Sequence, residues 1–376
     1  MSTTRYEPIS GSTMFKALVD KPLIIPACNI RIPFTAHVIF KAAKDTNSPL
    51  IIEIAKAECN LSDGYIGINI DEFASRMKQI AAEVEFDAWS LHADHISVKT
   101  GTREEIADIK KLIKAQVESG FTSFAVDASH LFNFEGETVY DRLKPNIDAT
   151  IELSHYIDEQ MGDRSYGLEV EVGEIGVKDS NGMVITSTEE ATVFIKALNN
   201  SGVYPHVLAI ANGSTHGNVY DEHGVQTNQV SIDIDQTKAI VKTLKDMGSD
   251  VKIAQHGITG TPLEYIKSMF PHGDILKGNI ATYWQNIVFD VLKLFEPELY
   301  SDIYTWVIET YGKEGVSDEE TFGKYTIREL SLFHERIGSV RPETLEAIDA
   351  RIYADSLLFV EAMKTRGMAS HVRRML

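Results

Sequence analysis

Eight short apolar runs recur along the chain with helical patterns between them, and this repeat limits the possible folds more than any other feature. The runs span residues 23–27, 50–54, 88–91, 123–126, 168–172, 206–210, 251–254 and 274–276. Near-continuous apolar runs are typical of parallel strands that are buried on both faces. The alternation of strands and helices predicts an α/β fold, a closed (β/α)8 TIM barrel.

An open, doubly wound parallel sheet is the alternative to the barrel. It is less favoured because no glycine-rich phosphate turn follows the first apolar run. After residue 292 the pattern becomes helical, over 303–310, 322–334 and 342–364. We therefore expect a catalytic barrel over residues 1–292 and a helical extension over 293–376. The extension would pack on the barrel or mediate oligomerisation.

Charge and cysteine content restrict the partners and the compartment. The net charge of the 376 residues is -19, which argues against a nucleic-acid partner and an anionic membrane surface. No apolar run approaches the roughly 18 residues of a membrane span. The two cysteines, Cys28 and Cys59, imply no disulfide framework and suit a reducing compartment. We expect a cytoplasmic protein.

Three histidines follow different predicted strands. His95, His216 and His256 come after the third, sixth and seventh runs, so a barrel would bring them to one rim. Three imidazoles with an open fourth position are typical of a catalytic zinc site. Polar residues also end other strands, among them Asn29 at the first and Asp127 at the fourth.

Small residues surround two of these histidines. Gly257, Thr259 and Gly260 would let backbone N–H groups and a hydroxyl approach an anion closely, and Thr282 after the eighth run adds a second hydroxyl. A phosphate site in the loops after strands seven and eight recurs in TIM barrels. The segment therefore indicates a phosphorylated ligand.

Five ordered motifs resemble the class II, metal-dependent fructose-bisphosphate aldolase family over residues 13–290. They are Leu91-His-Ala-Asp-His, Leu168-Glu-Val-Glu-Val-Gly, Ser214-Thr-His-Gly, Gln255-His-Gly-Ile-Thr-Gly and Lys277-Gly-Asn-Ile-Ala-Thr. Residues 120–130 and Pro26-Ala-Cys-Asn29 resemble the family's fourth and first strands.

The resemblance implies a role for each matching residue. His95, His216 and His256 would bind the catalytic zinc, and Glu171 would join them as the metal shifts. Asp94 would exchange a proton with the aldehyde, and Asn279 would hold the enediolate. His92 and Asp127 would orient the site from behind the ligands. A carboxylate on the loop after strand five would remove the substrate proton, with Asp179 the nearer candidate and Glu174 the second. The ketone-side phosphate and substrate would contact Asn29, Gly217, Gly257, Thr259, Gly260 and Thr282.

The resemblance further implies reversible cleavage of a phosphorylated ketose into a dihydroxyacetone-phosphate-like ketone and an aldehyde, as in glycolysis. The implied cofactor is Zn²⁺, with another divalent metal or an added monovalent cation as alternatives. The implied assembly is a homodimer or larger homo-oligomer. Two other functions stay open: a metal-dependent sugar-phosphate isomerase or epimerase, and a degenerate, non-catalytic partner subunit.

Three features depart from the family pattern. After His216-Gly217, the segment Asn218-Val219-Tyr220-Asp221 lacks the lysine that usually follows the tyrosine. Ala281 replaces the usual aspartate of the Asn-x-Asp motif, and Ala55 replaces a serine that commonly helps to bind the second phosphate. Lys56 is the nearby residue that could substitute for that serine. These departures bear on what is joined to the ketone rather than on the type of reaction.

Overall fold

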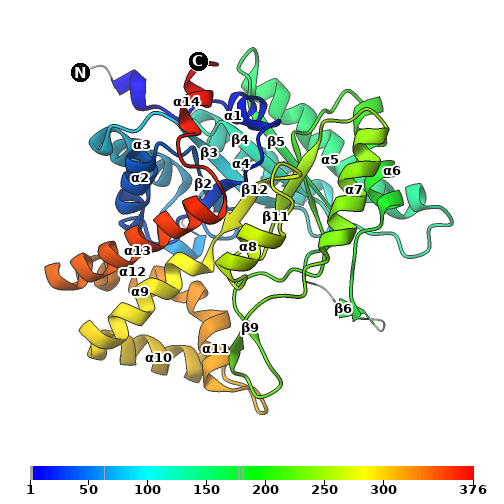
Figure 1. Ribbon diagram of the computed structural model, residues 1–376. Helices are drawn as coiled ribbons and strands as arrows, with labels where there is room; N and C mark the ends of the chain where they lie inside the picture. The colour runs from blue at the N-terminus through cyan, green and yellow to red at the C-terminus, as the bar shows by residue number, and fades with distance from the viewer. Residues whose placement is uncertain (1–2, 63, 177, 180–181) are drawn as a thin grey trace.

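Eight parallel strands close into a barrel in the computed structural model, which describes residues 3–62, 64–176, 178–179 and 182–376 (Figure 1). Strand β1 pairs with both β2 and β12, which closes the sheet. The predicted TIM barrel is therefore confirmed, and the open sheet is excluded. The barrel strands are β1 (Ile25–Asn29), β2 (Leu50–Ala55), β3 (Trp89–Ser97), β4 (Ser123–Asp127), β5 (Gly167–Val172), β8 (Val207–Ile210), β11 (Lys252–Gln255) and β12 (Ile275–Ile280).

Helices cover the outside of this barrel. Their inward faces carry the apolar residues of the larger core cluster, which lies between the helices and the sheet. These helices are α2 (Thr35–Thr46), α3 (Ile70–Val84), α4 (Arg103–Glu118), α5 (Val139–Met161), α6 (Thr188–Asn200), α7 (Ile234–Asp246), α8 (Leu263–Met269) and α9 (Thr282–Phe295).

Strands β3 and β12 continue well past the ends of their apolar runs. Strand β3 continues from Leu91 to Ser97, and β12 continues from Leu276 to Ile280. The added residues include His92, Asp94, Lys277 and Asn279, which are buried. These polar residues are tolerated in the interior because they bond to other polar and charged groups there. A prediction from apolar runs alone therefore places the ends of both strands too early.

Helix α1 (Gly11–Leu18) lies at the amino-terminal ends of the strands. The backbone N–H of Gly11 donates to the carbonyl of Thr122, immediately before β4. Met14, Phe15 and Leu18 pack with apolar side chains of the barrel strands, among them Ile25 and Ile51. This end of the barrel is therefore filled, and the polar side chains gather at the opposite end.

The carboxyl-terminal part of the chain is helical, as expected, and its longest helix packs on the barrel. Helix α13 lies against α2, α8 and α9, while α14 lies beside α1 (Figure 1). The stretch 322–334, which was expected to be helical, consists of the end of α11, the short 3-10 helix η3 (Thr326–Glu329) and the start of α12. The division at residue 292 stays a prediction. The helices are α10 (Pro297–Tyr311), α11 (Asp318–Tyr325), α12 (Leu330–Gly338), α13 (Pro342–Ala362) and α14 (Ala369–Arg373).

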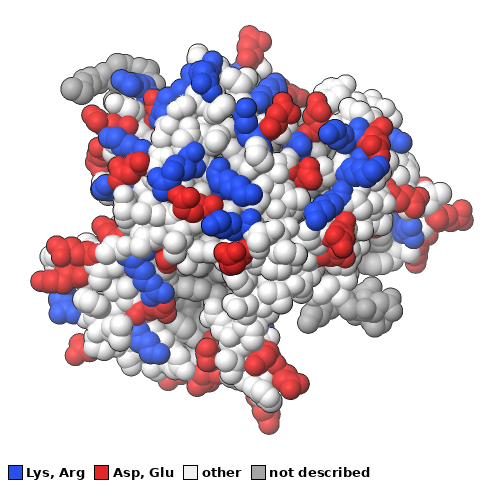
Figure 2. Space-filling view, viewed as in Figure 1, with Lys and Arg blue, Asp and Glu red and all other residues white. Residues whose placement is uncertain are grey.

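Acidic and basic side chains are interspersed over the face of the molecule shown in Figure 2. Within the described ranges, none of the helices combines the length and apolar character needed to cross a bilayer.

Candidate active site

Three imidazoles meet at the carboxyl-terminal end of the barrel. The ring centroid of His95 lies 5.2 Å from that of His216 and 4.6 Å from that of His256, and the latter two lie 5.3 Å apart. One nitrogen of each ring lies within 4.8 Å of the others. His216 is exposed and His256 is buried. This donor set fits a divalent metal such as zinc, with one side open to solvent.

A bulge in β3 turns His95 into this group. Strict alternation along a strand would place Asp94 and His95 on opposite faces. The register of β3 against β4 shifts between Ala93 and Ile96, and His95 has a left-handed backbone with φ 41°. His95 Nε2 consequently lies 3.9 Å from Asp94 Oδ2. A non-glycine residue in this conformation is strained, and such strain is common at functional sites.

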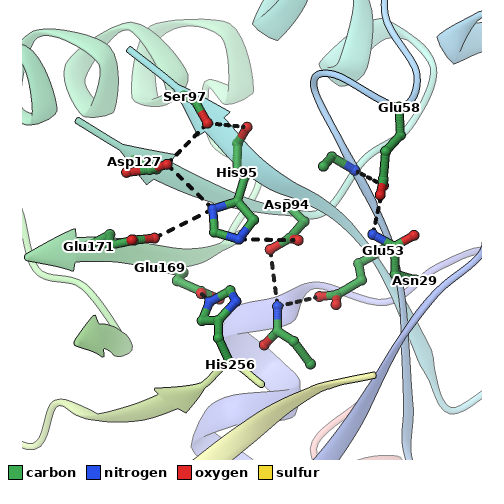
Figure 3. Close-up of polar contacts among 12 residues, drawn as sticks. Asn29, Glu53, Glu58, Asp94, His95, Ser97, Asp127, Glu169, Glu171 and His256 are labelled. Carbon is green, nitrogen blue, oxygen red and sulfur yellow. Dashed lines mark hydrogen bonds and ion pairs between the residues drawn. The ribbon is translucent and has the colours of Figure 1, made fainter. Parts of the chain in front are cut away.

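Two carboxylates hold the other nitrogen of the His95 ring (Figure 3). His95 Nδ1 lies 3.4 Å from Asp127 Oδ2 and 3.5 Å from Glu171 Oε2. Ser129 Oγ donates to Asp127 Oδ1 at 2.7 Å. Although burial opposes it, His95 and Ser129 keep the pKa of Asp127 below its usual value, whereas burial and the Asp127 charge raise the pKa of Glu171. This arrangement suits the predicted orienting role of Asp127. Glu171 lies on the same side of the ring.

A fully buried lysine occupies the centre of the barrel below the histidines. Lys277 Nζ lies 2.7 Å from Glu169 Oε2, 2.9 Å from Glu53 Oε2 and 3.7 Å from Asp94 Oδ1. Asn279 Nδ2 donates to Asp94 Oδ1 at 3.1 Å and to Glu53 Oε2 at 3.3 Å. The network thus fixes the orientation of Asp94 and Asn279, the two residues expected to act on the substrate.

Glu169 connects this network to two histidines. It lies 3.4 Å from His256 Nε2 and 3.4 Å from His92 Nε2, and His92 Nδ1 contacts Ser123 Oγ at 2.7 Å. Although burial opposes it, the Lys277 charge lowers the pKa of Glu169, so this carboxylate stays ionised. His92 thus contacts the three-histidine group through Glu169, in keeping with its expected place behind the ligands.

The residues predicted to bind phosphate lie on the loops after β8 and β11 and at the start of α9. We call this set the anion cup: Gly217, Gly257, Thr259, Gly260 and Thr282. A Cβ on Gly217 would lie 3.4 Å from Thr282 Oγ1, and Thr259 Oγ1 accepts from the Tyr283 N–H at 3.2 Å. The first N–H groups of α9 therefore belong to the cup, and its N-cap residue, Ala281, has no side chain that could bond them.

Gln229 clamps the two loops of the anion cup together. Its Oε1 accepts from the N–H and the hydroxyl of Thr215, both at 2.7 Å, and its Nε2 donates to the carbonyl of Gly257. Gly257 has φ 76°, and a Cβ there would lie 2.9 Å from Ser214 Cβ. A glycine is required here by both the backbone conformation and the close approach.

On the β1–β2 side of the mouth, Asn29 Nδ2 donates to Glu58 Oε2 at 2.7 Å. The same carboxylate accepts from Arg31 Nε at 2.7 Å. Asn29 therefore lies at the strand end where it was predicted, with its amide nitrogen already bonded.

The two candidate bases follow β5. Glu174 Oε1 lies 3.1 Å from His130 Nδ1, and its side chain is 42% exposed. Asp179 ends the two-residue strand β6 (Lys178–Asp179), which pairs with β7 (Gly182–Met183), but its side chain lies outside the described residues. Both residues belong to the loop that was expected to carry the base.

Several residues of the site were missed in the sequence. Glu53 and Lys277 are ionisable residues within largely apolar strands. Side chains alternate along β12, so Lys277 lies on the same face as Asn279, and this alternation indicates that Lys277 faces the site. Arg31, Glu58 and Gln229 lie in loops. Nothing in their local sequence indicates that they bond to distant parts of the site.

A closed barrel with imidazoles, carboxylates and an anion cup at the carboxyl ends of its strands defines an enzyme of the TIM-barrel class. The family model described as class-II fructose-bisphosphate aldolase matches residues 10–321. The chain therefore belongs to that family of aldolases.

Individual relatives are distant. A plasmid-encoded fructose-bisphosphate aldolase of Cupriavidus necator is 26% identical over 266 residues, covering 67% of this chain and 68% of the relative. The fructose-bisphosphate aldolase structure from Campylobacter jejuni aligns with a TM-score of 0.62 at 20% identity, over 96% and 97% of the two chains. The structure of the YdjI aldolase of Escherichia coli K12 aligns with a TM-score of 0.59 at 17% identity, over 96% of this chain and 99% of that chain. These structures establish the fold.

Proposed function

We propose that this chain is a zinc-dependent aldolase that reversibly cleaves a phosphorylated ketose into a dihydroxyacetone-phosphate-like ketone and an aldehyde. The observation that carries the proposal is the convergence of His95, His216 and His256 beside the anion cup. Family membership supports the reaction type. The distant relatives leave the particular ketose open.

The three imidazoles would hold the metal. When bound, a divalent ion would polarise the ketone carbonyl and make the neighbouring C–H bond more acidic. Asp127 contacts the Nδ1 atom of His95, and Glu169 contacts the Nε2 atom of His256. Such contacts keep the ligand rings in the orientation that binds metal.

The protein's own groups would carry the proton transfers. A carboxylate of the loop after β5, Asp179 or Glu174, would remove the proton from the carbon next to the carbonyl. Asn279 would donate a hydrogen bond to the resulting oxyanion. Asp94 is held by Asn279 and Lys277, so it is placed to give a proton to the aldehyde oxygen, or to take one from the hydroxyl in the reverse direction.

The anion cup would bind the phosphate of the ketone half. Its hydroxyls and the N–H groups at the start of α9 would supply the donors, and the helix dipole favours a negative charge there. Thr259 and Thr282 would supply the hydroxyl donors. Held at its phosphate, the ketone would present its carbonyl to the three histidines.

Metal dependence tests this function directly. Purified protein treated with a chelator should lose retro-aldol activity on a ketose phosphate panel, and added zinc or cobalt should restore it. Full activity in a sample shown by elemental analysis to be free of metal would refute the proposal. Borohydride with substrate should trap no adduct, because Lys277, the lysine at the barrel centre, is held by Glu53 and Glu169.

Product analysis separates this function from its alternatives. An aldolase yields two fragments, whereas an isomerase or epimerase yields one product of unchanged mass. A metal-loaded protein without turnover on the panel would instead point to the non-catalytic alternative. We further propose a cytoplasmic homodimer or larger homo-oligomer, which light scattering of the purified chain would test.

A further inference from the structure

Three hydrogen-bond donors from separate segments converge on the carboxylate of Glu58. Asn29 Nδ2 at the end of β1 and the backbone N–H of Ala55 at the end of β2 donate to Oε2, at 2.7 Å and 2.8 Å. Arg31 Nε donates to Oε1 at 2.7 Å. We call these three donors the donor recess. An amide, a backbone N–H and a guanidinium together form the kind of donor set that binds oxyanions.

Glu58 fills this recess completely enough to be shielded from water. Its side chain is 2% exposed, and the Arg31 side chain is 12% exposed. A buried carboxylate is stable when it is paired and hydrogen-bonded, as Glu58 is. A second anion at the same donors would have to displace Glu58 or lie against its charge.

The recess borders the part of the site where the substrate would react. In the barrel, Asn29 is paired with Glu53, and Ala27 is paired with Asn279. Arg31 Nη1 donates to Thr282 Oγ1 of the anion cup at 2.9 Å. Figure 3 shows Asn29 and Glu58 on the far side of Asp94 and Glu53 from His95 and His256.

Other donors near the recess are already engaged. Lys56 Nζ donates to the carbonyl of Ser97 at 2.5 Å. Ala55 offers its N–H but no side-chain hydroxyl. Lys56 therefore does not take the place of the missing serine, and the cationic group that lies in the recess, Arg31, is already neutralised by Glu58.

We propose that Glu58 is a specificity-determining residue that fills, with its own carboxylate, the recess where a second anionic group of the substrate would otherwise bind. This inference rests on the proposed aldolase function. It assigns a phosphate to the ketone half of the substrate and an uncharged, hydroxylated end to the aldehyde half. Selectivity arises because a charged aldehyde would meet a buried carboxylate, a like-charge contact that rejects it.

The test compares two aldehydes in the condensation direction. Dihydroxyacetone phosphate is supplied to the zinc-loaded protein with either D-glyceraldehyde or D-glyceraldehyde 3-phosphate, and kcat/KM is measured for each aldehyde. The wild type should favour the uncharged aldehyde. In Glu58→Ala the ratio should shift toward the phosphorylated aldehyde by about tenfold or more, since the recess donors become free.

A second measurement does not depend on turnover. Calorimetric titration with inorganic phosphate should detect one more bound phosphate per chain in Glu58→Ala than in the wild type. If the alanine variant does not fold, both measurements are made on Glu58→Gln, which keeps the shape of the side chain and removes its charge. The matched control is Glu105→Ala, because Glu105 also accepts several backbone N–H groups but lies in the first turn of α4, outside the recess. It should change neither the ratio nor the stoichiometry.

The outcomes separate the two proposals. Carbon–carbon bond formation with neither aldehyde, together with the extra phosphate in Glu58→Ala, would refute the aldolase proposal and support the recess. A wild type that prefers the phosphorylated aldehyde would overturn the role of Glu58. So would an unchanged phosphate stoichiometry in folded Glu58 variants.

Discussion

At the scale of single residues, the buried charges in the barrel differ in protonation because their surroundings differ. Glu169 contacts Lys277 and two histidines, which lower its pKa even though burial opposes the shift. Glu53 contacts the same lysine, yet burial and the Asp94 charge raise its pKa from 4.5 to about 8. At neutral pH the Glu169 carboxyl group is therefore ionised, and the Glu53 carboxyl group is neutral.

The neutral state of Glu53 predicts a pH-dependent stability. Because its pKa is raised on folding, its contribution is fully present below pH 4.5 and is lost as the pH rises to about 8. Glu53→Gln cannot ionise, so its stability relative to the wild type should rise across this window by up to about 1.4 kcal/mol per pH unit. Urea unfolding of metal-free protein at several pH values measures the difference. A difference that stays flat or falls with pH would contradict it.

Because the Asp127 carboxylate contacts His95, removal of the Asp127 charge should weaken metal binding. Asp127→Asn should reduce zinc affinity about 10- to 100-fold, since the His95 ring loses its charged partner. Competition with a chromophoric chelator measures this affinity. Asp233→Asn is the control, because Asp233 caps α7 far along the chain and asparagine caps equally well. Equal zinc affinity in the two variants would argue against an orienting role for Asp127.

At the scale of elements, the loops that form the anion cup depend on close backbone approach. Gly257 and Gly202 both have left-handed backbones, but they differ in surroundings. A Cβ on Gly257 would meet Ser214 and Thr215 within 2.9 Å, whereas a Cβ on Gly202 would meet nothing within 4 Å. Comparing alanine substitutions at Gly257 and Gly202 therefore separates the effect of backbone strain from the effect of crowding.

We expect Gly202→Ala to lower the free energy of unfolding by about 1 to 2 kcal/mol, from backbone strain alone. Gly257→Ala should cost about 1 to 3 kcal/mol more, because the loops after β8 and β11 must move apart. It should also raise KM for the phosphorylated substrate, whereas Gly202→Ala should leave KM unchanged. Urea unfolding and steady-state kinetics measure both effects, and equal losses in the two variants would show that crowding at Gly257 is unimportant.

At the scale of the whole molecule, the carboxyl-terminal helices are connected to the site by packing. Phe359 on α13 lies 5.0 Å from Tyr283 and 5.6 Å from Trp284, between ring centroids. Tyr283 follows Thr282 of the anion cup, and its N–H donates to Thr259. Helix α13 therefore supports the start of α9, where the phosphate is expected to bind.

This packing predicts different effects at adjacent positions of α13. Phe359 is 2% exposed and Leu358 is 52% exposed. Phe359→Ala should lower the free energy of unfolding by about 3 to 5 kcal/mol through the cavity it leaves. Leu358→Ala should change it by less than about 0.5 kcal/mol. Thermal and urea unfolding would compare the two, and a large loss at Leu358 would indicate that another chain covers this face.

The sequence alone determined the barrel and the rim on which its histidines lie. Continuous apolar runs mark buried parallel strands whatever their neighbours are, and the parallel arrangement brings the residues after each strand to one end. His95, His216 and His256 could be grouped on that basis before any contact was known.

The tertiary structure decided how the polar groups face one another. Three features depend on contacts between separate strands or loops. They are the bulge that turns His95 beside Asp94, the burial of Lys277 among three carboxyl groups, and the bonds from Asn29 and Arg31 to Glu58. Their energies depend on distance and on exclusion of water, which the closed barrel sets and local sequence does not.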